Sequence, residues 1–269
     1  MLLVMGVVNT TPDSFTDGTL DPDAAIALGL QLWKDGADIL DVGGEATNPK
    51  ATPIDADEEL RRVLPVVRAL AAAGARVSID TTKAVVARAA LAAGATIVND
   101  VSGGLWDPEM PAAVGGATYI AGHLRGGSLA EVFTAEAPAS WREVADELAA
   151  RIAPFRDVWV DPGLGFGKGA GDTNLELIRR AGDLGRALGK PVVVGPSRKR
   201  FLRRLLLADE RTLGGSAAAG RRGPIDATPL QLDAASVAAC LAAVTHGASV
   251  LRVHNVALLR AALAVYTRL

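Results

Sequence analysis

The sequence contains little cysteine, few aromatic residues, no strong excess of one charge and no long apolar run. Cys240 is its single cysteine, which excludes an intrachain disulfide, a cysteine zinc cluster and a redox pair. The alanines, valines and leucines around Cys240 predict a buried structural thiol. A formal net charge of -2 argues against nucleic acid as the main partner.

The chain also lacks the signals of membrane insertion and export. It has no uninterrupted run of about 18 apolar residues, as a membrane-spanning helix would need. Its first residues lead into an expected strand without a basic segment or a cleavage site. We therefore expect a soluble cytoplasmic protein whose partners are small molecules rather than nucleic acid or a membrane.

What the sequence does contain is a regular alternation of short Val/Ile/Leu runs with amphipathic helical patterns, typical of βαβ units. The predicted strands are Leu2–Val8, Asp38–Val42, Arg76–Ile79, Thr96–Val98, Thr118–Ala121, Val158–Val160, Pro191–Val194 and Val250–Val253. The predicted helices are Asp23–Asp35, Asp57–Ala73, Lys83–Ala93, Pro108–Val114, Trp141–Phe155, Asn174–Leu188, Arg200–Leu206 and Ala234–His246.

Eight such pairs within 269 residues fit an α/β fold of the closed (β/α)8 TIM-barrel type, which typically needs about 250 residues. An open doubly wound sheet is the alternative. No linker divides the chain, so we expect a single domain spanning residues 1–269. The stretch Gly214–Pro229, rich in Gly, Ala, Arg and Pro, predicts a flexible loop before the last helix.

Polar side chains follow each predicted strand. They are Asn9, Asp41, Asp80, Asn99 with Asp100, His123 with Arg125, Asp161, Ser197 to Lys199, and His254 with Asn255. Because barrel enzymes build their sites at the C-terminal ends of the strands, we expect these residues to converge on one pocket.

The stretch Val158–Lys168, VWVDPGLGFGK, is the most distinctive of these strand ends. An apolar strand is followed by Asp161, a proline and three glycines before the next helix, which presents an acid at the mouth of an α/β fold. The alternative is an ordinary loop whose aspartate caps that helix.

Seven blocks of the sequence, in order along the chain, resemble the dihydropteroate synthase family. They are MGVVNTTPDSFTDGT (Met5–Thr19), GADILDVGGEATNP (Gly36–Pro49), SIDTTKAVVARAAL (Ser78–Leu91), IVNDVSGG (Ile97–Gly104), DPGLGFGK (Asp161–Lys168), VGPSRKRFL (Val194–Leu202) and LRVHNV (Leu251–Val256). The resemblance implies a barrel that joins 6-hydroxymethyl-7,8-dihydropterin diphosphate to p-aminobenzoate, giving 7,8-dihydropteroate and diphosphate in folate biosynthesis. It also implies a homodimer and a target of sulfonamides.

A pterin carries a guanidine-like edge of donors beside a carbonyl, which buried carboxylates and a carboxamide complement. By resemblance these readers are Asp80, Asn99 and Asp161, and Lys199 reaches the carbonyl side. The resemblance further implies that Phe166 and Gly195 line the slot for the ring. For Asp80 the alternative is a helix cap before Thr81.

The diphosphate needs cations and N–H donors. Arg252 and His254, two residues apart at the end of the last strand, point the same way and suit a phosphate clamp. By resemblance Asn9 is a ligand of Mg2+, which neutralises the leaving diphosphate.

Three further segments are expected to take part in substrate binding. Asp13 and Asp17 lie in a loop that would close over the site, and Asp41 ends the second strand. Thr47 lies in the loop that the resemblance assigns to the second substrate.

The expected mechanism needs no nucleophilic side chain. The C–O bond to diphosphate breaks early, the pterin cation is stabilised by Asp80, and the aryl amine attacks. We therefore expect Asp80, Asp161 and Lys199 to be the catalytic residues, with Mg2+, Arg252 and His254 on the leaving group.

Five residues in four segments depart from the family pattern. They are Asn48 in place of an arginine, Arg200 in place of a serine, Gly122 and Leu124 in place of methionines, and Asn255 in place of an aspartate. Because the pterin readers are intact and the second-substrate loop is altered, p-aminobenzoate and sulfonamide affinity should differ from that of typical members. A pterin-binding paralogue without synthase activity, a pterin-dependent methyltransferase and a non-enzymatic scaffold are the alternatives.

Overall fold

The computed structural model describes residues 2–11, 21–48, 51–135, 137–169, 172–208 and 226–269. Asp13 and Asp17 lie outside these residues, as does most of the predicted loop Gly214–Pro229. Within the described part no helix is long and apolar enough to cross a membrane.

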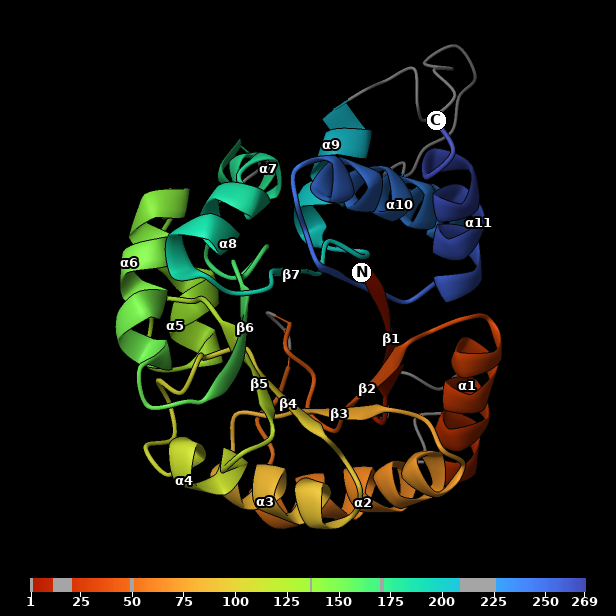
Figure 1. The fold of residues 1–269 in the computed structure, drawn as a ribbon, viewed down its shortest axis with the longest axis vertical. Coiled ribbons are helices and arrows are strands. Elements are labelled where there is room, and N and C mark those ends of the chain that lie inside the picture. Colours follow the sequence, from red (N-terminus) through yellow and green to blue (C-terminus); the bar gives the residue numbers. More distant parts are fainter. Residues whose placement is uncertain (1, 12–20, 49–50, 136, 170–171, 209–225) are drawn as a thin grey trace.

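Eight parallel strands form the barrel that the alternation predicted (Figure 1). They are β1 (Leu3–Asn9), β2 (Ile39–Gly43), β3 (Val77–Asp80), β4 (Ile97–Asp100), β5 (Thr118–Gly122), β6 (Asp157–Asp161), β7 (Val193–Val194) and β8 (Val250–Val253). Neighbours pair in the order β6-β5-β4-β3-β2-β1-β8-β7, and a bridge between Val160 and Val192 joins the two ends. The barrel is therefore confirmed, and the open-sheet alternative is wrong.

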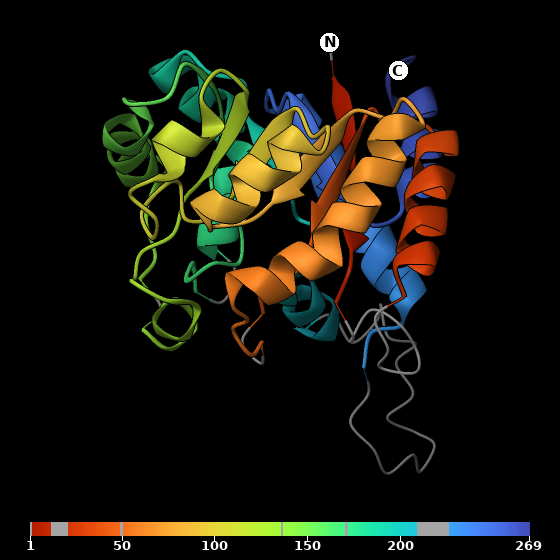
Figure 2. The ribbon, with the colours of Figure 1, turned by 90° about the horizontal axis from the view of Figure 1, so that it is seen from below.

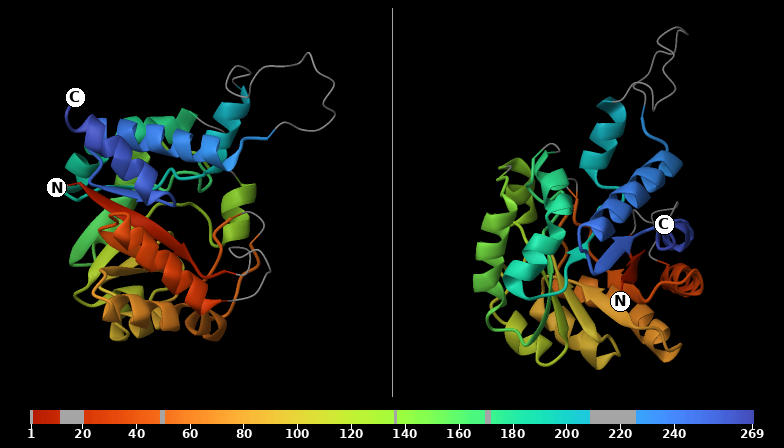
Figure 3. Two further views of the ribbon diagram at one scale, coloured as in Figure 1. Left: turned by 90° about the vertical axis from the view of Figure 1, so that its right-hand side faces the viewer. Right: turned by 45° about the horizontal axis from the view of Figure 1, so that its top comes forward.

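Helices surround the barrel on its outside (Figures 1 and 3). They are α1 (Pro22–Lys34), α2 (Ala56–Ala72), α3 (Ala84–Ala92), α4 (Met110–Val114), α5 (Leu129–Thr134), α6 (Trp141–Ile152), α7 (Asp172–Arg179), α8 (Ala181–Leu188), α9 (Arg200–Ala208), α10 (Pro229–Thr245) and α11 (Val256–Tyr266). The N- and C-termini lie together, on the side opposite the C-terminal ends of the strands (Figure 2).

The helices differ from the prediction in four places. The predicted helix Asn174–Leu188 is divided into α7 and α8, and α5 and α11 were not predicted. Helix α10 begins at Pro229 rather than Ala234, because Thr228 and Gln231 form a capping box in front of it. The break before α8 brings its first turn against α10, where the Gly182 N–H donates to the His246 carbonyl at 2.6 Å.

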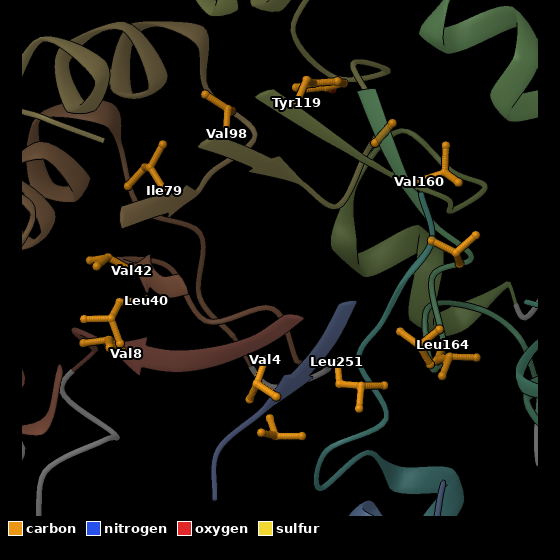
Figure 4. Close-up of a cluster of buried hydrophobic side chains, with 14 of the residues drawn as sticks. Val4, Val8, Leu40, Val42, Ile79, Val98, Tyr119, Val160, Leu164 and Leu251 are labelled. Atoms are coloured by element: carbon orange, nitrogen blue, oxygen red, sulfur yellow. The ribbon is translucent and has the colours of Figure 1, made fainter. Parts of the chain in front are cut away.

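The strands alternate between two apolar layers. Outward-facing side chains such as Val8, Leu40 and Val42 lie side by side beneath the helices (Figure 4). Inward-facing side chains form a second cluster that fills the barrel, made of Met5, Ile39, Ile97, Ile120, Val193 and Val250. Cys240 is fully buried in the outer layer, and burial raises the pKa of its thiol to about 12, as expected of a structural cysteine.

We expect Ile97→Ala to reduce the free energy of unfolding by about 2–5 kcal/mol, because a cavity would open in the inner cluster. Urea unfolding followed by circular dichroism measures this change. Val85→Ala on α3 is the control, since Val85 is 48% exposed and should change stability by only about 0.5 kcal/mol. Equal losses in both variants would contradict the assignment of Ile97 to a packed interior layer.

Candidate active site

A cavity of about 420 Å3 opens at the C-terminal ends of the strands. The predicted site residues other than Asp41 all line it, namely Asn9, Thr47, Asp80, Asn99, Asp161, Phe166, Gly195, Lys199, Arg252 and His254. The expected convergence of these residues on one pocket is therefore observed.

The cavity floor follows from the two-residue period of the strands. Two residues beyond inward-facing Ile97 comes Asn99, beyond Trp159 comes Asp161, and beyond Val250 comes Arg252. Two residues further along each of these strands, the inward-facing side chains thus change from apolar to polar. The apolar cluster closes the bottom of the cavity, and the polar side chains face its ligand.

Arg252 is the centre of the ion network on this floor. Its Nε donates to Asp41 Oδ2 and its Nη2 to Asp80 Oδ2, each at 2.6 Å. The Asn99 amide donates to the same Asp41 oxygen at 3.0 Å. Asp41 is fully buried beneath these partners rather than on the cavity wall, so it supports Arg252 and Asn99 from below.

Asp161 and Phe166 are held by the glycine-rich loop after β6. The Gly163 N–H donates to Asp161 Oδ1 at 2.7 Å. Lys199, which precedes α9, donates to the Leu164 carbonyl at 2.5 Å and lies 4.1 Å from the centre of the Phe166 ring. A carboxylate, an ammonium group and an aromatic face therefore meet on one wall of the cavity.

Burial sets the charge state of these groups. Desolvation raises the pKa of Asp80 to about 7, against the opposing effect of Arg252, and it also raises the pKa of Asp161. Desolvation lowers the pKa of Lys199 to about 8, although Asp161 opposes it. Asp80, Asp161 and Lys199 are therefore less well solvated than free groups, and such shifted pKa values are typical of ligand-binding and catalytic sites.

Desolvation, followed by the charge of Arg252, also lowers the pKa of His254 to about 4, so this imidazole is neutral at physiological pH. Its Nδ1 lies 2.9 Å from Ser197 Oγ, which in turn accepts the His254 backbone N–H at 3.2 Å. Ser197 Oγ can accept this N–H and also donate to Nδ1 or accept from it, so the contact holds the imidazole in place whichever ring nitrogen carries the proton.

The turn that carries Ser197 and Lys199 is anchored on α10. Arg198 has a φ of 56°, the only positive φ at a described residue other than glycine. Its guanidinium binds both oxygens of Asp233, at 2.7 and 3.0 Å, and its backbone N–H donates to Ser236 Oγ at 2.9 Å. These contacts stabilise a backbone conformation that aims the neighbouring side chains at the cavity.

Asn255 completes this anchor and explains one departure from the family pattern. Its Nδ2 donates to Asp233 Oδ2 at 3.0 Å, while its Oδ1 accepts the Leu258 N–H and caps α11. An aspartate could provide the cap but could not donate to Asp233 while ionised.

Three other predicted strand-end residues face away from the cavity, so the expectation that they join it was wrong. Asp100 accepts hydrogen bonds from Tyr119, Ser102 and Gly104. His123 and Arg125 bind Glu147 on α6. Each follows an inward-facing residue or lies beyond the strand, and the alternation of the strand turns it outward.

The cavity also has a wall that was not predicted. Phe133 of α5 lines it and packs against Phe166, with 6.0 Å between the ring centres. Ser128 caps α5 by accepting the Glu131 N–H. The Ser-x-x-Glu spacing before the apolar residues of α5 was the signal in the sequence.

The mouth of the cavity carries Asn9, Thr47, Asn48 and Arg200. Arg200 begins α9 and is exposed, whereas Arg198 and Arg252 are bound by carboxylates. No group of three His, Cys, Asp or Glu side chains in the described residues could hold a metal ion. Asn9 therefore fits an ion shared with a bound ligand better than one held by the protein alone.

A parallel barrel with desolvated acids, a carboxamide and cations around a cavity at its C-terminal ends defines a barrel enzyme for a small polar substrate. Comparison with known proteins makes the class specific. The family model described as pterin binding enzyme matches residues 5–254. Dihydropteroate synthase of Mycobacterium leprae is 43% identical over 268 residues, covering 94% of this chain and 88% of that protein.

Solved structures agree. Xanthomonas albilineans dihydropteroate synthase with 4-aminobenzoic acid has a TM-score of 0.82 and 38% identity, covering 99% of this chain and 92% of that one. Burkholderia cenocepacia dihydropteroate synthase complexed with 7,8-dihydropteroate has a TM-score of 0.81 and 37% identity, covering 100% of this chain and 91% of that one. The chain belongs to the pterin binding enzyme family, among its dihydropteroate synthases.

We expect Asn255→Asp to reduce the free energy of unfolding by about 1–3 kcal/mol at pH 7, because it sets a second carboxylate against Asp233. Asp233 would raise the folded-state pKa of the new carboxyl. The penalty is therefore present above that raised pKa and disappears as the pH falls to the unfolded value of about 3.9. Urea unfolding at pH 7 and pH 4 measures it.

Asn255→Ser is the matched control, since serine also caps a helix but adds no charge. Equal stability of the Asp and Ser variants at pH 7 would contradict the role given to the Asn255 amide.

Proposed function

We propose that this protein condenses 6-hydroxymethyl-7,8-dihydropterin diphosphate with p-aminobenzoate, forming 7,8-dihydropteroate and releasing diphosphate. The observation that carries the proposal is the set of acceptors on the cavity floor, Asp80, Asn99 and Asp161, beside the aromatic face of Phe166. The whole chain, residues 1–269, acts as one pterin-binding domain, and we propose that it works as a homodimer in the cytoplasm.

The pterin binds through its donor edge. Carboxylates at Asp80 and Asp161 and the carboxamide of Asn99 accept its N–H groups, and the Lys199 ammonium donates on the carbonyl side. Phe166 and Gly195, which both line the cavity, flank the ring. A ligand without the donor edge would leave two buried acids unpaired, and this cost makes the pocket selective.

The diphosphate lies toward Arg252 and His254. Arg252 uses two N–H donors on Asp41 and Asp80, and a guanidinium has five, so donors remain for phosphate oxygens. With its proton on Nε2, the neutral imidazole of His254 would be a further donor. Asn9 would hold Mg2+ together with the diphosphate oxygens, and this ion would neutralise the leaving group.

The chemistry then depends on charge placement rather than on a nucleophilic side chain. As the C–O bond to diphosphate breaks, the pterinylmethyl group becomes cationic, and the carboxylate of Asp80 stabilises it electrostatically. Arg252, between Asp80 and the leaving group, stabilises the charge that moves to the diphosphate. The p-aminobenzoate amine attacks the methylene carbon and forms the C–N bond, and the resulting ammonium then releases a proton to solvent.

We expect the protein to form dihydropteroate and diphosphate from the two substrates with Mg2+, measured by chromatography and diphosphate release. Its kcat/KM for the pterin substrate should fall at acidic pH, because Asp80, with a pKa of about 7, and Asp161, whose pKa burial also raises, then become protonated. Asp80→Asn should reduce kcat/KM by about 100-fold. Asp57→Asn, an exposed acid on α2, is the control.

The alternatives give different results in this assay. Pterin binding without product would indicate a paralogue that lacks synthase activity. Transfer of a methyl group from a folate to a corrinoid protein would indicate a methyltransferase. Absence of pterin binding would overturn the proposal itself.

We also propose that Arg200 binds the carboxylate of p-aminobenzoate in place of the cation that position 48 lacks. Arg200→Ser should weaken binding of p-aminobenzoate and of sulfonamides by roughly 10- to 100-fold, the value of one charged contact, while the KM for the pterin diphosphate stays unchanged. Steady-state kinetics with sulfonamide titration measure both effects.

Arg88→Ser on α3 is the control, since Arg88 is exposed and does not line the cavity. Tighter p-aminobenzoate binding in the Arg200 variant would show instead that Arg200 obstructs the second substrate.

A further inference from the structure

Lys168 is a buried cation outside the reaction described above. Lys168 is only 1% exposed. Its ammonium group forms no salt bridge with a carboxylate of the described residues. Its Nζ donates instead to two carbonyls, those of His123 at 3.0 Å and Phe166 at 3.2 Å. An ammonium group without a carboxylate partner is costly to bury, so its position requires an explanation.

The two carbonyls belong to two backbone segments that lie in close contact. His123 follows β5, and Phe166 lies in the glycine-rich loop after β6. Gly163 in that loop has a φ of 72°, and a Cβ there would lie 1.8 Å from the His123 carbonyl oxygen. Lys168 thus joins the loop to the end of β5 at the point where the backbones approach most closely.

Two lysines hold alternate carbonyls of this loop. Lys199 binds the Leu164 carbonyl from the cavity side, and Lys168 binds the Phe166 carbonyl from the buried side. The Phe166 ring that lines the cavity is therefore fixed through its own backbone. Without Lys168 the loop would still contain the Phe166 ring, but the ring would no longer be held in its position at the cavity.

The charge of Lys168 also acts on Asp161. Burial raises the pKa of this carboxyl, and the groups that oppose the rise are, from the largest effect to the smallest, Lys199, the Gly163 N–H, Arg252 and Lys168. Lys168 itself faces Asp161, Lys199, Arg125 and Arg151, and burial lowers its pKa to about 7. It is therefore charged in the acidic range, where an ionised Asp161 needs its support.

We propose that Lys168 is a positioning residue for the pterin, which sets Phe166 against the ring and keeps Asp161 ionised for the donor edge. This inference rests on the proposed function. It assigns the lysine at the end of the Asp161–Lys168 motif a role that does not require contact with the substrate.

Asn174 provides a matched control. It is fully buried on α7 and holds the same loop, since its Oδ1 accepts the Gly165 N–H at 2.7 Å and its Nδ2 donates to the Gly169 carbonyl at 3.4 Å. It carries no charge. Asn174→Leu therefore loosens the loop without changing the electrostatics of Asp161.

The experiment compares wild type, Lys168→Met, Lys168→Gln and Asn174→Leu in turnover of pterin diphosphate and p-aminobenzoate across pH. We expect Lys168→Met to lower kcat/KM for the pterin substrate on the order of 10- to 100-fold, with the KM for p-aminobenzoate unchanged. The acid limb of its pH profile, which is the fall of kcat/KM at low pH, should move to higher pH, because Asp161 then protonates more readily. Lys168→Gln keeps N–H donors without charge and should recover part of kcat/KM but not the acid limb.

Asn174→Leu should lower kcat/KM while the acid limb stays at the wild-type pH. Wild-type kinetics in Lys168→Met, or the same acid limb in all variants, would overturn the proposal. Failure of both Lys168 variants to fold would also overturn it, since the lysine would then serve folding alone. An inactive wild type would instead refute the proposed function, which keeps the two outcomes distinct.

Discussion

Closure of the barrel is the constraint on which the site depends. Once eight parallel strands close, every second side chain must fit inside, and neither water nor a helix can cover it. The inner cluster of Met5, Ile39, Ile97, Ile120, Val193 and Val250 fills the lower part of this space. The next inward step, about 7 Å further along the strands, is the first position where polar groups can meet a ligand.

This placement explains why the floor of the cavity is electrically balanced rather than simply acidic. Asp41 and Asp80 are too deeply buried to be left unpaired, and Arg252 reaches both from β8. Asp161 has Lys199 and the Gly163 N–H as its nearest partners. The side chains that neutralise one another in the folded barrel without ligand are also the donors and acceptors proposed for the pterin and the diphosphate, so the proposal makes one set of side chains serve both stability and recognition.

Strand-end position and the family resemblance together allowed the inner part of the site to be predicted from the sequence. Asn99, Asp161 and Arg252 lie two residues beyond apolar inward positions, so the strand pattern explains in physical terms why they face the cavity. The same rule, applied strictly, would have turned Asp100 outward beside inward Asn99, and Asn255 outward beside His254. Phe133 could not be placed in this way, because α5 is a six-residue helix in a loop and its position depends on packing against Phe166.

The departures from the family pattern fall at the rim, at the edge of the interior and also inside it, where Gly122 and Leu124 are buried. Positions 80, 99 and 161 are fixed by strand register and by buried partners, so a change there would leave a charge unpaired. Asn48 and Arg200 lie at the mouth, where solvent screens a charge and a change alters only which ligand is held. Asn255 lies at the edge of the interior, where its amide donates to Asp233, the carboxylate that also binds Arg198. Among these departures, Asn48 and Arg200 are the two that are both exposed and part of the cavity lining, so a change there bears on the ligand rather than on the packing of the barrel.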